Sequence, residues 1–208
     1  MINPAKIRNI IFDWGGVVIN LNLKFTLEKF KKLGLADIEK YFTQSNQVDL
    51  FDKLETGKIQ SHEFITRLNE LFPEPPGEQA ILTAWNAMLL DFPAPHAELL
   101  LKLKLRYKTF LLSNTNEIHL AFYLSMLENS GFKDMSHYFH KVYYSCRINL
   151  RKPNKEIFEY VVNDNNLNPA ETLFIDDTLQ HVEGARTTGL IAHHLVKPEG
   201  ILMLLKEF

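Results

Sequence analysis

Five short apolar runs constrain the fold of this chain more than any other feature. Each is short enough to be a strand that is buried on both faces. They cover Lys6 to Asp13, Lys108 to Ser113, Val142 to Ser145, Thr172 to Asp176 and Ile191 to Val196. A helix-like stretch precedes each of the last four runs, and these stretches cover Ala97 to Tyr107, Asn116 to Asn129, Pro153 to Asn165 and Val182 to Thr188. This alternation predicts an α/β fold, a doubly wound sheet of five parallel strands with helices on both faces.

The segment between the first two runs shows helical periodicity and no convincing strand pattern. Its helix-like stretches cover Leu23 to Leu33, Gln47 to Glu55, Ser61 to Leu71 and Glu78 to Leu90. Ser61 stands where a capped helix start is expected, and Pro93 marks the exit from the segment. We therefore expect a core domain of residues 1–17 and 93–208, and a helical cap domain of residues 18–92 over the carboxyl edge of the sheet. The alternative is an ordinary helical layer with no role as a lid.

Charge and cysteine content argue against several classes of protein. The 208 residues carry a net charge of −2 with no block of basic residues, which argues against nucleic-acid binding. No apolar run is long enough to span a membrane, and the amino-terminal run lacks the cleavage pattern of a signal peptide. The single cysteine, Cys146, cannot form an internal disulfide. We expect a cytoplasmic protein with no membrane contact, and no obligate protein partner is evident.

Polar side chains gather where the predicted strands end, which is the edge at which parallel sheets bind ligands. Asp13 closes the first run, and the glycines that follow it let a ligand approach the backbone. The later polar segments are Ser113 to Asn116, Arg151-Lys152 and Asp176-Asp177. Most of them also have a structural interpretation, as turn formers, helix caps or a solvated pair before a proline at the first helical position. Two adjacent carboxylates repel each other, however, and a divalent cation would relieve that repulsion.

Together these groups suit phosphoryl transfer. A carboxylate nucleophile and a phosphate repel each other, by about 4 kcal/mol for unit charges at about 4 Å and an effective dielectric of about 20. Magnesium held by Asp13 and Asp177, together with Lys152, would offset this repulsion. Ser113 and backbone N–H groups near Asn114 would hold phosphate oxygens.

These residues resemble the haloacid dehalogenase-like hydrolase superfamily, in which a Rossmann-like core carries an inserted helical cap. Its four motifs are matched in order by Asp13-Trp14-Gly15-Gly16-Val17, Ser113-Asn114, Lys152 and Asp176-Asp177. The resemblance spans residues 8–196. Ser113-Asn114-Thr115-Asn116, Leu150-Arg151-Lys152-Pro153 and Val182-Glu183-Gly184-Ala185 are similar to the glucose-1-phosphatase-like branch, which includes the phosphatase domain of soluble epoxide hydrolases.

The resemblance implies a role for each matched residue. Asp13 would be the nucleophile, Lys152 a catalytic residue that also binds the substrate phosphate, and Ser113 and Asn114 further phosphate ligands. Magnesium would be the cofactor, bound by Asp13, the carbonyl of Gly15, Asp176 and Asp177. In the family, the ligand at Asp177 is usually direct and the one at Asp176 often acts through water.

Three positions depart from the family pattern. Gly15 stands where most members have a second Asp as general acid and base. His181 stands where an Asn is usual, and Asn149 replaces a Gly, which is a mild change because Asn tolerates a left-handed backbone. Losing a general acid typically costs about 10²- to 10⁴-fold in rate. Gly15 therefore favours substrates with good leaving groups and argues against a phosphosugar mutase.

No residue in the sequence clearly replaces the missing acid. His62 and His119 are candidates, although each is more often a surface or core residue. Trp14 could stack on a sugar, but packing beneath the insert is the favoured interpretation.

The leading hypothesis is a magnesium-dependent phosphatase of a small phosphorylated metabolite, such as a hexose 1-phosphate. A catalytically impaired member that binds a phosphorylated ligand or a protein is the main alternative, suggested by Gly15 and His181. A 2-haloacid dehalogenase is less favoured, because that chemistry has no use for the cation that Asp176 and Asp177 would bind.

Overall fold

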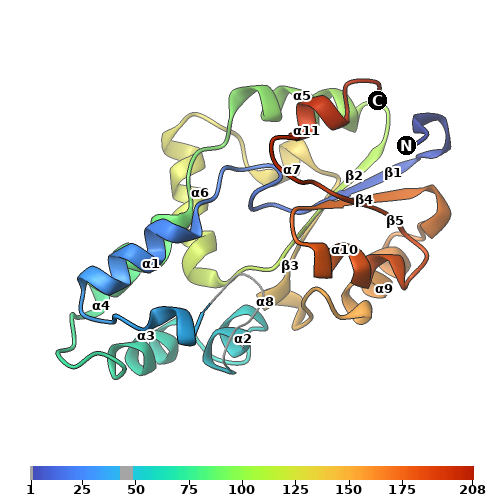
Figure 1. Ribbon diagram of the computed structural model, residues 1–208. Coiled ribbons are helices and arrows are strands. Elements are labelled where there is room, and N and C mark those ends of the chain that lie inside the picture. Colours follow the sequence, from blue (N-terminus) through green and yellow to red (C-terminus); the bar gives the residue numbers. More distant parts are fainter. Residues whose placement is uncertain (1, 43–48) are drawn as a thin grey trace.

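The computed structural model describes residues 2–42 and 49–208, and its centre is a sheet of five parallel strands. The strands are β1 (Asn9–Phe12), β2 (Lys108–Ser113), β3 (Lys141–Tyr144), β4 (Thr172–Asp176) and β5 (Ile191–His194). Their order across the sheet is β3-β2-β1-β4-β5, so β1 lies in the middle and pairs with β2 and β4 (Figure 1). The predicted fold class is confirmed.

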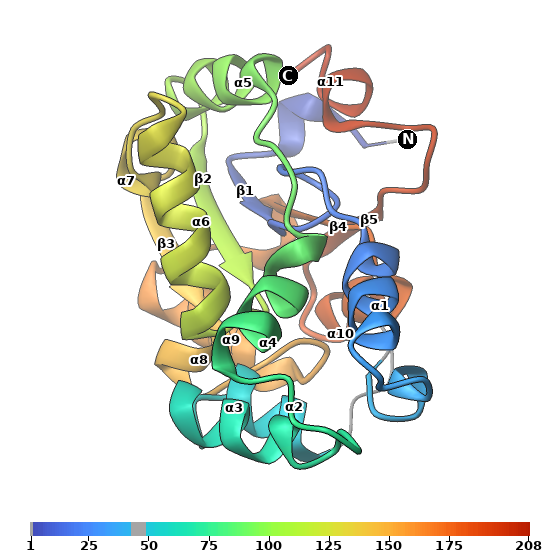
Figure 2. The ribbon, with the colours of Figure 1, turned by 90° about the vertical axis from the view of Figure 1, so that its left-hand side faces the viewer.

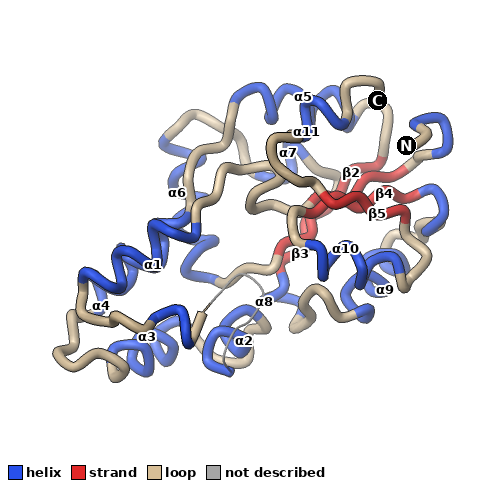
Figure 3. The backbone as a smooth tube through the Cα atoms, viewed as in Figure 1, coloured by secondary structure: helices blue, strands red, loops and turns tan. Residues whose placement is uncertain are grey.

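Helices cover both faces of the sheet (Figure 3). The helices are α1 (Leu23–Lys32), α2 (Asp49–Glu55), α3 (Ser61–Asn69), α4 (Glu78–Trp85), α5 (Ala94–Lys104), α6 (Glu117–Asn129), α7 (Met135–Tyr138), α8 (Ser145–Ile148), α9 (Lys155–Asp164), α10 (Leu179–Arg186) and α11 (Ile201–Leu204). Alternate residues of β1 point to opposite faces, so Ile10 and Phe12 pack with α5, α6, α7 and α11. Ile11 faces the other way and packs with α9 and α10. None of the helices in the described ranges is long and apolar enough to cross a membrane.

Helices α1–α4 lie together at one end of the sheet (Figures 1 and 2). They share a hydrophobic cluster that is separate from the two clusters on the sheet faces. Trp85 is central to this cluster, with the rings of Phe51 and Phe64 each 5.4 Å from its ring. Ile118 of α6 is the one buried member that comes from beyond residue 92. The segment therefore has a hydrophobic cluster of its own, which Ile118 joins from α6.

The structure corrects details of the predicted helices. The cap residue of α3 is Gln60, without a side-chain hydrogen bond, so the cap predicted at Ser61 is wrong. Pro153 precedes α9, whose cap residue is Asn154, and is not the first helical residue. Asn116 does cap α6, with its Oδ1 accepting from the backbone N–H of His119. The start predicted at Gln47 lies outside the described residues, and α2 is described from Asp49.

Gly184 on α10 is required by a close approach of the backbone. A Cβ at this position would lie 2.2 Å from the carbonyl oxygen of Pro153, which follows Lys152 in the chain. We predict that Gly184→Ala destabilises the protein by about 1–3 kcal/mol, because the added methyl group overpacks the contact. Thermal unfolding measures this loss. Gly200→Ala is the matched control, because a Cβ there meets no atom within 4 Å, and an equal loss in both variants would contradict the explanation.

Candidate active site

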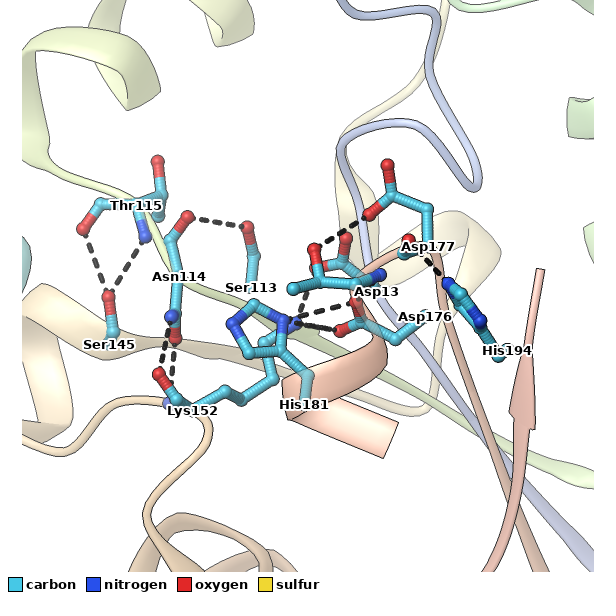
Figure 4. Close-up of polar contacts among 11 residues, drawn as sticks. Asp13, Ser113, Asn114, Thr115, Ser145, Lys152, Asp176, Asp177, His181 and His194 are labelled. Carbon is cyan, nitrogen blue, oxygen red and sulfur yellow. Dashed lines mark hydrogen bonds and ion pairs between the residues drawn. The ribbon is translucent and has the colours of Figure 1, made fainter. Parts of the chain in front are cut away.

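Three carboxylates meet at the carboxyl end of the sheet. Asp13 follows β1, Asp176 ends β4 and Asp177 comes next in the chain. Because β1 and β4 are neighbours in register, with Phe12 opposite Ile175, Asp13 and Asp176 are brought side by side. One oxygen from each of the three carboxylates lies within 4.8 Å of the others (Figure 4).

Lys152 lies beneath this cluster and is completely buried. Its Nζ donates to Asp13 Oδ1 and to Asp176 Oδ2, each at 2.6 Å. Burial alone would favour the neutral amine, but the charges of Asp13 and Asp176 outweigh it and raise the pKa of Lys152. One positive charge therefore faces three carboxyl groups.

The carboxyl groups respond differently to this environment. Burial raises the pKa of Asp13 to about 8, against the attraction of Lys152 and with added repulsion from Asp176 and Asp177. Burial and the charge of Asp176 also raise the pKa of Asp177. For Asp176, burial is outweighed by Lys152 and His181, which lower its pKa to about 2. The cluster thus holds more negative charge than Lys152 can balance, which suits a divalent cation.

Asp176 and Asp177 are placed differently despite being adjacent. Asp176 accepts hydrogen bonds from Lys152 Nζ, from the backbone N–H of Thr178 (2.8 Å) and from His181 Nδ1 (3.0 Å). Asp177 lines the cavity, whereas Asp176 is completely buried and is not among the lining residues. The carbonyl of Asp177 also bonds His194 Nε2 at 3.0 Å. Asp177 is therefore the better placed of the two for a direct bond to a metal.

The end of β2 is tied to the segment that carries Lys152. The side chain of Asn114 accepts from the Lys152 N–H and donates to the Lys152 carbonyl, both at 2.9 Å. Because the Asn114 side chain already bonds the Lys152 backbone, we expect Asn114 to contact phosphate through its backbone N–H. Ser113 is buried, and its hydroxyl bonds weakly to the Asn114 carbonyl at 3.4 Å. Both Ser113 and Asn114 line the cavity beside Asp13.

The cavity over Asp13 has a volume of about 140 Å³. Asp13, Ser113, Asn114 and Asp177 line its base. Residues from the helical segment line the opposite wall, which is apolar apart from one carboxylate: Ile19, Leu21, Leu23, Phe42, Glu55, Met88 and Leu89. A phosphate at the base would therefore have its leaving group directed at that wall.

The two glycines after Asp13 have different consequences. Gly16 has a φ of +79°, and a Cβ there would lie 2.3 Å from Asp177 Oδ2, so only glycine leaves room for that carboxylate. At Gly15, a Cβ would meet the Cδ1 of Leu21 at 2.8 Å. The end of the Leu21 side chain thus occupies the space beside the position where most family members have their acid.

The structure argues against both histidines proposed as the missing acid. His62 is exposed on α3 and is not among the residues lining the cavity. His119 lines the cavity but is buried, and its ring stacks on Trp85 at 4.7 Å. Its Nε2 lies 3.2 Å from the Trp85 carbonyl and its Nδ1 lies 3.2 Å from Asn116 Nδ2. Both ring nitrogens are thus engaged in a way that suits neutral imidazole.

Trp14 packs, as predicted, but not beneath the insert: it belongs to the hydrophobic cluster on the sheet face and not to the cluster of α1–α4. Its side chain is buried, with the rings of Tyr123 at 4.9 Å, Phe92 at 5.7 Å and Phe139 at 6.3 Å.

Glu55 and Arg151 also line the cavity, although the sequence analysis predicts no site role for either residue. Glu55 ends α2 and is buried, and Arg151 Nη2 lies 3.0 Å from its carboxylate. An acidic residue at the end of a helix usually faces solvent, so only the tertiary structure reveals this position.

His119 makes the stability of the protein depend on pH. Burial lowers its pKa to about 4 from an ordinary value of 6.5, so between these values the unfolded chain binds a proton that the folded chain does not. Stability from this residue is complete above about pH 6.5 and is lost as the pH falls toward about 4. We predict that acidification from pH 7.5 to pH 5 costs the wild type about 2 kcal/mol more than it costs His119→Gln. Urea unfolding at both pH values measures this difference, and equal losses would show that His119 is not buried in its neutral form.

Comparisons with known proteins agree with this geometry. Residues 7–189 match the model of the haloacid dehalogenase-like hydrolase family. A D-ribitol-5-phosphate phosphatase of Bacteroides thetaiotaomicron is 31% identical over 183 residues, which cover 88% of this chain and 89% of that protein. A sesquiterpene phosphatase of Aspergillus oryzae is 27% identical over 199 residues, covering 95% and 94% of the two chains.

A solved structure extends the likeness to three dimensions. An alanine mutant of a haloacid dehalogenase family enzyme from Bacteroides thetaiotaomicron, in complex with magnesium and inorganic phosphate, superposes with a TM-score of 0.90. It is 34% identical, and the match covers 96% of this chain and 98% of that one. The family model and this likeness lead to the same conclusion: this chain belongs to the haloacid dehalogenase-like hydrolase family.

Proposed function

We propose that this protein is a magnesium-dependent phosphatase that hydrolyses a small phosphorylated metabolite, with Asp13 as its nucleophile. The observation that carries the proposal is the buried cluster in which Lys152 bridges Asp13 and Asp176 while Asp177 faces the cavity. Two relatives that are named as phosphatases support the reaction class. A sugar phosphate such as a hexose 1-phosphate stays a prediction for the substrate.

The reaction would proceed in two displacements. An Asp13 carboxylate oxygen attacks phosphorus, the bond from phosphorus to the leaving oxygen breaks, and that oxygen takes its electron pair. Gly15 has no proton to give, so the leaving oxygen takes its proton from solvent. A water molecule then attacks phosphorus in the aspartyl-phosphate, the bond from phosphorus to the Asp13 oxygen breaks, and a proton of the water passes to solvent, which releases phosphate and restores the Asp13 carboxylate. Lys152, with Ser113 and the N–H of Asn114, would hold the transferred phosphoryl group throughout.

The donor set at the site fits magnesium. Asp13 and Asp177 offer carboxylate oxygens, the carbonyl of Gly15 is a further candidate, and Asp176 would act through water because its oxygens already accept hydrogen bonds. When bound, the cation would supply positive charge that offsets the repulsion between Asp13 and the phosphate. The neighbouring enzyme with magnesium and phosphate supports this assignment.

We also propose that residues 18–92 form a cap over a core of residues 1–17 and 93–208. The separate hydrophobic cluster of α1–α4 supports this division, and so does the wall that the segment contributes to the cavity. The cap would exclude water during transfer. A cytoplasmic location remains our proposal, supported by the unpaired Cys146.

The alternative functions are less well supported by the site. A dehalogenase would need no cation, yet Asp176 and Asp177 add negative charge beside Asp13. A protein that only binds a phosphorylated ligand would not need a lysine bonded to the nucleophile. Beryllium fluoride with magnesium separates the cases: thermal stabilisation without turnover of any phosphate ester would favour the binding protein.

We predict that Asp13→Asn abolishes magnesium-dependent hydrolysis of an aryl phosphate, because the amide cannot act as the nucleophile. Release of the aryl alcohol, measured with magnesium and with a chelator, tests this. Asp164→Asn is the control, because Asp164 pairs with Lys141 at the surface, away from the cavity. Activity that survives both chelation and Asp13→Asn would refute the proposal.

We predict that Gly15→Asp raises kcat toward an alkyl phosphate by about ten-fold or more, because the new carboxyl group can protonate a poor leaving group. The Cβ of the new residue meets the flexible end of the Leu21 side chain, which can move aside. Gly15→Asn, of equal size and without a proton to transfer, should give no gain. Steady-state rates on alkyl and aryl phosphates measure the effect, and a folded Gly15→Asp variant without a gain would contradict our account of the missing acid.

A further inference from the structure

The segment Asn149–Lys152 connects the helical insert to the catalytic cluster. On the insert side, Arg151 Nη1 donates to Asp52 Oδ1 at 2.7 Å, and its Nη2 lies 3.0 Å from Glu55 Oε2. Both acids belong to α2. The side chains of Arg151 and Glu55 are only 17% and 11% exposed, so water screens this ion pair far less than it screens a surface pair.

Asn149 makes a second contact with the same end of α2. Its Nδ2 donates to the carbonyl of Thr56 at 2.8 Å. Asn149 adopts a left-handed backbone with a φ of 56°, which ends α8 and turns the chain. Two residues of one short segment therefore hold the carboxyl end of α2.

Lys152 faces the opposite direction from Arg151. Its side chain bonds Asp13 and Asp176, and Asn114 bonds both its N–H and its carbonyl. Adjacent residues thus join α2 on one side to the nucleophile on the other. A displacement of α2 would pull on Arg151 and, through one peptide unit, on the lysine.

We propose that Arg151 is a positioning residue, which couples the closed placement of α2 over the cavity to the placement of Lys152 against Asp13. This inference rests on the proposed phosphatase reaction and adds a residue to it. Arg151 and Glu55 both line the cavity. Their ion pair would therefore hold the cavity wall that faces the leaving group as well as position Lys152. The substrate would then bind in a site whose cavity wall and Lys152 are both positioned by Arg151.

Kinetics of Arg151→Gln test the coupling. We expect kcat for an aryl phosphate to fall about ten-fold, with a smaller change in KM, at a temperature at which the variant is fully folded. Arg151→Lys should recover part of kcat. Arg147→Gln is the matched control, because it removes an arginine that pairs with Glu117 at the surface. Combining Arg151→Gln with Asp52→Asn and Glu55→Gln should lower kcat no further, since the pairs act as one unit.

Hydrogen–deuterium exchange provides a readout that does not depend on turnover. Arg151→Gln should speed exchange in α2 and also around Asn114 and Lys152, whereas Arg147→Gln should change neither. Faster exchange in α2 alone, or a kcat within two-fold of the wild type, would overturn the coupling. A failure of the phosphatase proposal is distinguished from a failure of the coupling by the behaviour of the wild type. If the protein is not a phosphatase, the wild type shows neither turnover of a phosphate ester nor thermal stabilisation by magnesium with beryllium fluoride. In that case the exchange data alone would decide whether Arg151 couples the two regions.

Discussion

The ammonium group of Lys152 is the contact on which the arrangement of the site depends. A fully buried lysine is stable only when acceptors surround it, and here Asp13 and Asp176 supply them at 2.6 Å each. These acids come from β1 and β4, so the bond requires both strands to be neighbours in register. The Lys152 backbone must also be held, which Asn114 does from the end of β2. Through its ammonium group and its backbone, one buried lysine therefore links three of the five strands at their carboxyl ends.

The sequence predicted the sheet well because its three central strands, β1, β2 and β4, are buried on both faces over almost their whole length. Lys108–Ser113 and Thr172–Asp176 were predicted with the bounds that the structure has, since each is a continuous apolar run that ends at a polar residue. Helix starts were harder to predict. Ser61 looked like a cap by residue type, but the chain turns one residue earlier, at Gln60, whose side chain makes no cap bond. Caps depend on local backbone geometry, which residue type alone does not determine.

Much of the candidate site could be predicted from strand ends, whereas the roles of its polar neighbours could not. Asp13, Asp176 and Asp177 had to meet because parallel strands end at one edge. The side chain of Asn114 bonds the Lys152 backbone, and the ring of His119 is held beside Trp85. Both arrangements depend on contacts between distant segments of the chain. Glu55 gave no signal for the same reason: only the packing of α2 against Arg151 turns a helix-end acid into part of the cavity wall.

Leu21 shows how the missing acid could shape the choice of substrate. Its side chain approaches Gly15 and lines the cavity, so an apolar surface stands where a proton donor usually lies. In the proposed reaction, a leaving oxygen in that environment would gain no proton from the protein and would bear its own charge until solvent supplied one. The barrier to the first displacement would then depend on how well the leaving group tolerates negative charge, while Lys152 would still stabilise the phosphoryl group. Gly15 would thus limit the range of phosphate esters that react, and would have less effect on the transfer of the phosphoryl group itself.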